Sequence, residues 1–122
     1  MLRIELPAII DNVNCGEPFT LDFKVQVFSK ETNINCVFYF PSDEIDCSFL
    51  VLDEGTNTEI KRANISKSWQ SLHFDDGPVP LSLTIKLSCD FEGDTRPIKI
   101  KCTATDDSGY HVSDIVIALT TC

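Results

Sequence analysis

Three stretches of the sequence alternate apolar and polar residues with a strict period of two. Residues 19–28 place Phe19, Leu21, Phe23, Val25 and Val27 on one face, with polar residues between them. Residues 81–89 and 98–105 show the same alternation. Successive side chains of an extended strand point to opposite faces, so each stretch is predicted to be a half-buried β-strand. Three such strands predict an all-β fold.

Six weaker candidate strands lie around these three, at residues 2–6, 34–40, 47–52, 58–62, 67–74 and 111–120. Segments rich in Gly, Pro, Asn, Asp and Ser separate them, and these residues supply the backbone angles of turns. No segment sustains the 3.6-residue period of a helix. We therefore predict an all-β, two-sheet antiparallel sandwich of about seven to nine strands, forming a single domain over residues 1–122.

The C-terminal third of the chain resembles the last three strands of immunoglobulin-like domains. Residues 81–85 look like strand E of that family, residues 98–109 resemble strand F with its turn, and residues 112–119 resemble strand G. Cys102, Ala104 and Gly109 match the family pattern Tyr-x-Cys-x-Ala-x-Asn-x-x-Gly. Residues 16–21 look like the start of strand B. The resemblance implies an immunoglobulin-like sandwich of the I-set or of the cadherin or bacterial repeat type.

The sequence departs from that family at the residues between the sheets. The strand-B cysteine is replaced by Phe23, the strand-F tyrosine by Ile100, and the strand-C tryptophan falls near Phe38 or Tyr39. Cys102 therefore lacks the cysteine with which its equivalent pairs in the family. We expect Phe23 and Cys102 to lie together in the dry layer between the sheets.

The hairpin after residue 98 is also similar to the end of cadherin-type or bacterial immunoglobulin-like repeats, where Ala-x-Asp-x-Gly carries calcium ligands. That resemblance implies Asp106, Asp107 and Asp114 as candidate calcium ligands, since hard cations prefer oxygen donors. The alternative is that these acids only shape a hairpin turn. We favour the turn, because the other calcium motifs of such repeats are missing, and we expect no cofactor and no resident metal.

The charge of the chain limits its partners. It has 19 acidic and 10 basic residues and a formal net charge of −9. Nucleic-acid binding requires a basic surface, and an anionic membrane would repel this chain. No stretch approaches the roughly 20 apolar residues that a membrane helix needs, so we expect no membrane insertion. The acids serve solubility or attract a protein partner with a basic surface.

The chain contains six cysteines, namely Cys15, Cys36, Cys47, Cys89, Cys102 and Cys122. An even number is typical of a disulfide framework in an extracellular domain. However, Cys89 and Cys102 fall on the apolar phase of their strands, where a thiol behaves as a small hydrophobic group. The N-terminus also lacks the apolar region of a signal peptide. We therefore expect reduced, buried thiols and a cytoplasmic rather than extracellular location, unless the chain is an excised domain.

The spacing of the cysteines does not indicate zinc, because there is no Cys-x-x-Cys and no neighbouring Cys/His pair. The two histidines, His73 and His111, have acidic residues nearby in sequence and are the obvious candidates for a general base. No nucleophile motif such as Gly-x-Ser-x-Gly accompanies them, and the five glycines form no phosphate loop. We therefore predict that the protein is not an enzyme.

Three residues are candidates for contacts with a partner: Trp69, Tyr110 and His111. Trp69 lies in a polar segment typical of an edge strand, so it either anchors a partner or covers the core. The predicted function is a non-catalytic protein–protein interaction module, such as a subunit or appendage of a larger assembly. Two alternatives stay open: a small acidic inhibitor or immunity-type protein that blocks a basic partner, and a calcium-binding adhesin-like repeat. The sequence specifies neither the partner nor the oligomeric state.

Overall fold

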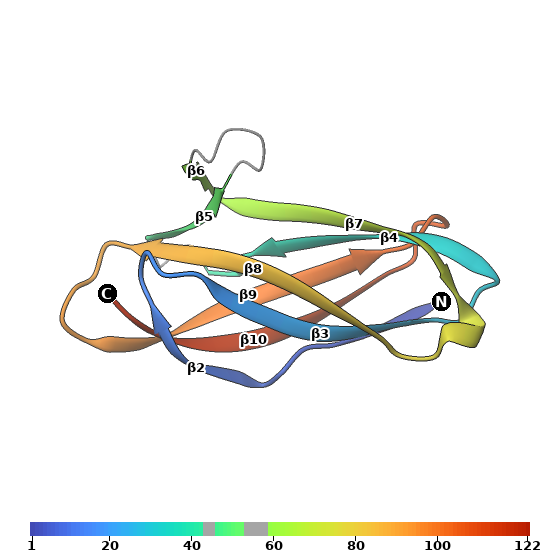
Figure 1. The fold of residues 1–122 in the computed structure, drawn as a ribbon, viewed down its shortest axis with the longest axis horizontal. Helices are drawn as coiled ribbons and strands as arrows, with labels where there is room; N and C mark the ends of the chain where they lie inside the picture. The colour runs from blue at the N-terminus through green and yellow to red at the C-terminus, as the bar shows by residue number, and fades with distance from the viewer. Residues whose placement is uncertain (43–45, 53–58) are drawn as a thin grey trace.

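Two five-stranded sheets lie face to face in the computed structural model, which describes residues 1–42, 46–52 and 59–122 (Figure 1). The first sheet contains, in spatial order, β1 (Leu2–Glu5), β3 (Phe19–Val27), β8 (Val79–Cys89), β5 (Cys47–Leu52) and β6 (Glu59–Arg62). The second contains β2 (Ile9–Asn14), β10 (His111–Thr121), β9 (Thr95–Thr105), β4 (Glu31–Tyr39) and β7 (Asn64–His73). A short 3-10 helix, η1 (Phe74–Asp76), follows β7. The prediction of an all-β, two-sheet sandwich is confirmed.

Strands that are distant in the sequence are neighbours in each sheet. In the first sheet β3 lies between β1 and β8, and in the second sheet β9 lies between β10 and β4. Between β4 and β8 the chain first forms the hairpin β5–β6 in the first sheet and then returns to the edge of the second sheet as β7. β2 pairs with β10 in parallel, and the other pairings of the described strands are antiparallel. The described residues thus form ten strands, where about seven to nine were expected.

The apolar faces of the alternating strands fill the space between the sheets, as predicted. Phe23 on β3 is 3% exposed, and Cys102 on β9 is fully buried. The ring of Phe23 lies 5.6 Å from that of Phe38 on β4 in an edge-to-face arrangement, a geometry that aromatic pairs favour. An aromatic contact between the sheets therefore occupies the region where the resemblance places a disulfide.

β2 was not predicted, because its sequence does not alternate. This strand is an edge strand whose residues Ile9 and Asp11 are both exposed, and Asn12 has a φ of 59°. Its pairing with β10 shifts register between Ala118 and Thr120. A bulge of this kind breaks the period of two that the prediction relied on. Residues 53–57, which separate the predicted strands 47–52 and 58–62, lie outside the described residues.

The expectation that all six cysteines are reduced is wrong. The structure contains the disulfides Cys15–Cys122 and Cys47–Cys89. Cys47 and Cys89 are directly opposite each other on β5 and β8, and such pairs are close enough to bond. The alternation within a strand shows which face a cysteine is on but not which residue of another strand lies opposite it. Cys47 and Cys89 are 42 residues apart in the sequence. The cysteines therefore no longer support a reducing compartment.

Cys36 and Cys102 are free and buried in the core, as expected for Cys102. A hydrogen bond with Cys36, together with burial, raises the pKa of the Cys102 thiol far above its ordinary value. This thiol is therefore inert at neutral pH. In the part of the chain that the structure describes, no helix is long and apolar enough to cross a membrane.

Candidate interaction surface at the loop end

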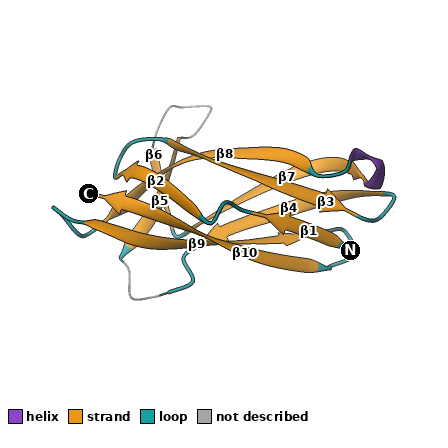
Figure 2. Ribbon diagram, turned by 90° about the horizontal axis from the view of Figure 1, so that it is seen from below, coloured by secondary structure: helices purple, strands orange, loops and turns teal. Residues whose placement is uncertain are grey.

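One end of the sandwich carries three connections, which we call the loop end. They are residues 28–30 between β3 and β4, residues 73–77 around η1, and residues 106–110 between β9 and β10. Figure 2 shows η1 and the N-terminus at this end, whereas the C-terminus lies at the opposite end. The two disulfides lie toward the C-terminus, at what we call the disulfide end. The β-strands therefore separate the two ends.

Exposed aromatic residues gather at the loop end. Phe28, Phe74 and Tyr110 are 50%, 47% and 43% exposed, and each belongs to a different connection. Met1, 67% exposed, lies beside them, because its carbonyl oxygen accepts a hydrogen bond of 3.0 Å from the backbone N–H of Phe28. Aromatic side chains are costly to leave in water and are enriched in protein interfaces. The loop end therefore has the composition of a contact surface.

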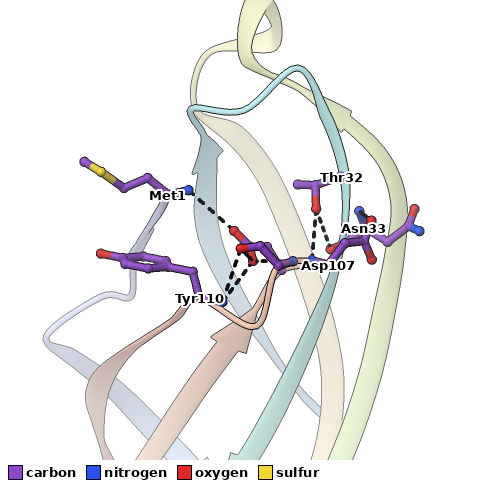
Figure 3. A network of polar contacts seen from close by, with 7 residues as sticks. Met1, Thr32, Asn33, Asp107 and Tyr110 are labelled. Atoms are coloured by element: carbon purple, nitrogen blue, oxygen red, sulfur yellow. Dashed lines mark hydrogen bonds and ion pairs between the residues drawn. The ribbon is translucent and has the colours of Figure 1, made fainter.

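Asp106 fixes the position of Tyr110 through a hydrogen bond to its backbone. Figure 3 shows Met1 and Tyr110 in the same network of polar contacts. The Oδ1 atom of Asp106 accepts hydrogen bonds from the backbone N–H of Ser108 at 3.0 Å, the Ser108 hydroxyl at 2.6 Å and the Tyr110 N–H at 3.1 Å. The amino group of Met1 lies 3.5 Å from Oδ2. Gly109 has a φ of 87°, which a side chain would strain. Asp106 therefore closes the turn from which the Tyr110 side chain projects.

The environment of Asp106 also controls its ionisation. Burial favours the neutral carboxyl, but hydrogen bonds from Ser108 and Tyr110 and the charge of the nearby Met1 amino group outweigh it. The pKa of Asp106 therefore lies below its ordinary value. The carboxylate is ionised at neutral pH and holds the turn in that state.

The three acids proposed as calcium ligands do not share a site. Asp107 Oδ2 accepts a hydrogen bond of 3.0 Å from the N–H of Asn33, which ties the turn to β4. Asp114 lies on β10, where Oδ2 accepts from the N–H of Leu6 at 2.9 Å. Among the described residues, the three carboxylates do not gather around one point. Their backbone partners give them a role in the hairpin and in strand packing.

Phe74 is held by the cap of η1. The Nδ1 atom of His73 accepts a hydrogen bond from the N–H of Asp75 at 3.1 Å, and Asp76 Oδ2 accepts from the N–H of His73 at 2.8 Å. These reciprocal bonds form a capping box. The imidazole also stacks on the Phe74 ring at 4.5 Å. His73, a candidate general base in the sequence, thus orders this connection, and His111 is exposed at the start of β10.

Trp69 does not belong to the loop end. It lies on β7, half-buried against the core, with its ring 5.6 Å from that of Phe23 in an edge-to-face contact. The Nζ atom of Lys67 lies 6.0 Å from the centre of the indole. This is the position of a residue that covers the core.

The loop end is mainly acidic. The exposed ionisable residues of its three connections and their edges include Lys30 and four acids: Glu31, Asp75, Asp76 and Asp107. Clustered charge of one sign attracts opposite charge and repels like charge. A partner for this surface would combine apolar groups with positive charge.

Sequence reasoning named Tyr110 and His111 as candidates for partner contacts but did not name Phe28 and Phe74, which belong to the same end of the sandwich. The available signal for Phe28 was a break in pattern, because the alternation of residues 19–27 fails at this residue. Strand phase gave no such signal for Phe74, which lies two residues after the buried Leu72. An apolar residue that falls out of phase at the end of a strand is expected to be exposed. The sequence did not show that both lie at the same end as residue 110.

No protein-family model matches the chain, and no curated protein matches its sequence. Among solved structures, the chain is similar to the major pilin subunit of Bacillus cereus, at 11% identity and a TM-score of 0.48. The match covers 99% of this chain and 41% of the pilin chain. This chain thus spans less than half of that protein's length.

Two further solved structures are more distantly similar. AvmM, described as catalysing macrocyclization in alchivemycin A biosynthesis, matches at 10% identity and a TM-score of 0.37, over 97% of this chain and 87% of its own. A protein of Francisella tularensis matches at 14% identity and a TM-score of 0.34, over 91% and 88% of the two chains. Such distant likenesses carry no argument about what this protein does.

Proposed function

We propose that the protein is a non-catalytic interaction module that binds a basic protein partner through its loop end. The observation that supports this most is the gathering of three aromatic side chains, each 43–50% exposed, on three separate connections at one end of a rigid sandwich. A module of this kind can serve as a subunit or appendage of a larger assembly.

The three side chains are suited to act as anchors because their backbones are already ordered. Asp106 holds the turn of Tyr110, the capping box holds Phe74, and a backbone bond ties Phe28 to Met1. Aromatic residues dominate the energetics of many interfaces, and a preorganised residue loses less entropy on binding. A partner therefore need not order these connections before it binds them.

Charge sets the kind of partner. The net charge of −9 and the four exposed acids of the loop end attract a basic surface and raise its rate of association. Exposed charges are screened by salt, with a Debye length of about 8 Å at physiological ionic strength. Binding is therefore expected to weaken as the salt concentration rises, mainly through slower association.

The test compares three forms of the protein as immobilised baits in native lysate of the source organism. These are the wild type, the triple variant Phe28→Ser/Phe74→Ser/Tyr110→Ser, and the matched control Ile9→Ser/Ile115→Ser. The control residues are 53% and 41% exposed but lie on β2 and β10, away from the loop end. Exposed substitutions usually change stability by less than about 0.5 kcal/mol each, so all three forms should fold.

The proposal predicts that wild type and control capture the same basic protein, that high salt weakens the capture, and that the triple variant fails to capture it. Equal capture by the triple variant and the wild type would show that the partner does not bind through the loop end, and would contradict the proposal. If the captured protein is an enzyme or toxin and loses activity on binding, the module is the acidic inhibitor that the charge also supports.

A further inference from the structure

Four cysteines that are far apart in the sequence lie at the disulfide end, and the sulfurs of three of them form one group. Cys15 follows β2 and Cys122 follows β10, both in the second sheet, whereas Cys47 and Cys89 face each other on β5 and β8 of the first sheet. The Sγ atoms of Cys15, Cys89 and Cys122 all lie within 4.8 Å of one another. Cys47 Sγ is bonded to Cys89 Sγ, so the fourth sulfur adjoins this group through Cys89.

Three of the four sulfurs are close enough together to be ligands of one tetrahedral zinc–thiolate site. With Zn–S bonds of about 2.3 Å, the four sulfurs of such a site lie about 3.8 Å apart. After reduction, the cysteine side chains would have to rotate to bring the sulfurs to this spacing. Soft thiolates favour Zn²⁺ over hard cations, and sets of four cysteine ligands are common in structural zinc sites.

Backbone hydrogen bonds hold these segments together independently of the disulfides. The N–H of Cys15 donates to Thr121 O at 2.9 Å, and that of Gly16 donates to Leu87 O at 2.8 Å, which ties the turn between β2 and β3 to β8. Near the other cysteines, the N–H of Gly93 donates to Cys122 O at 3.1 Å. These backbone hydrogen bonds bring the cysteine-bearing segments together without involving the sulfur atoms.

We propose that the protein, once its two disulfides are reduced, binds one zinc ion between Cys15, Cys47, Cys89 and Cys122. Each disulfide accepts two electrons and two protons from a dithiol reductant, which closes into its own disulfide, and two thiols form. Binding of Zn²⁺ then releases the thiol protons as the sulfurs become ligands. The four half-buried side chains are accessible to both reductant and metal.

The two disulfides would cross-link the disulfide end in the oxidised protein, and one metal ion bound to the same four sulfurs would cross-link it in the reduced protein. The spacing of the cysteines gave no sign of zinc, because the ligands come from four separate strands or strand ends rather than from a local motif. This inference is independent of the proposed interaction at the loop end, since it concerns the opposite end of the sandwich.

The test uses the full chain reduced anaerobically with a phosphine and then titrated with Co²⁺, whose thiolate complexes absorb in the near ultraviolet and visible regions. Three forms are compared: wild type, Cys89→Ser, and the matched control Cys36→Ala/Cys102→Ala, which removes the two free thiols instead. In parallel, cysteine alkylation with and without Zn²⁺ is mapped by mass spectrometry. Thermal unfolding of the reduced wild type is recorded with and without Zn²⁺.

The proposal predicts one tetrahedral cobalt–thiolate complex per chain in the wild type and the control, displaced by Zn²⁺ and absent from Cys89→Ser. Zn²⁺ should slow alkylation of the four ligand cysteines and raise the unfolding temperature of the reduced protein. Reduced wild type that forms no such complex and gains no stability from Zn²⁺ would overturn the proposal. So would a cobalt signal that persists in Cys89→Ser or requires Cys36 and Cys102.

Discussion

Replacing Cys15 and Cys122 with serine is expected to remove a large part of the protein's stability. Their bond closes a loop with a sequence separation of 107 residues, for which the chain-entropy relation gives about 4.8 kcal/mol at 25 °C. The Cys47–Cys89 bond spans 42 residues, and the same relation gives about 3.9 kcal/mol. Domains are stable by only about 5–15 kcal/mol, so each loss should be easy to measure.

The assay is urea unfolding of the wild type and the two double-serine variants, without reductant or metal. With a denaturant slope of about 2 kcal/mol/M, each variant should lose about 2 M in its midpoint. The Cys15→Ser/Cys122→Ser variant should be the less stable of the two by about 0.8 kcal/mol, because its loop is longer. Losses below about 1 kcal/mol for both variants would show that these bonds do not constrain the unfolded chain, and would refute the reasoning.

Three further predictions concern single residues. Asp106→Asn should lower the free energy of unfolding at neutral pH. The pKa of Asp106 is lowered in the folded protein, so its ionised carboxylate stabilises the fold above about pH 5. This stabilisation is lost as the pH falls through the pKa of the folded state. Urea midpoints that differ equally at pH 7 and pH 3 would contradict this. Phe23→Ala should cost about 3–5 kcal/mol, whereas Ile115→Ala at an exposed site should cost less than about 0.5 kcal/mol, as calorimetry would show. Cys102 should resist alkylation in the native protein at pH 8 and react after unfolding, and rapid native labelling would count against its burial.

The sequence predicted those parts of the fold in which one face of a strand meets the core and the other meets water. The burial of β3 alternates residue by residue up to Val25, so Phe23 was placed correctly by its phase. β2 escaped prediction because it is an edge strand with a bulge between Ile10 and Val13 and a positive φ at Asn12, where packing does not impose a period of two.

The two ends of the sandwich were harder to predict than its strands. The approach of Cys47 to Cys89 depends on the register of β5 against β8, and the sequence does not encode this register in any local motif. The same holds for Phe28, Phe74 and Tyr110, which the topology brings to one end from three distant connections. Local patterns therefore predicted the layers, whereas the candidate sites required the three-dimensional arrangement of the strands.

Hydrogen–deuterium exchange of the free protein and of its complex with the captured basic partner shows which surface the partner covers. If the partner binds the loop end, exchange in the complex is slower at residues 28–31, 73–77 and 107–111, with no change in β2 or at the disulfide end. Protection confined to β2, to β7 or to the disulfide end, with unchanged exchange at the loop end, would contradict binding through the loop end.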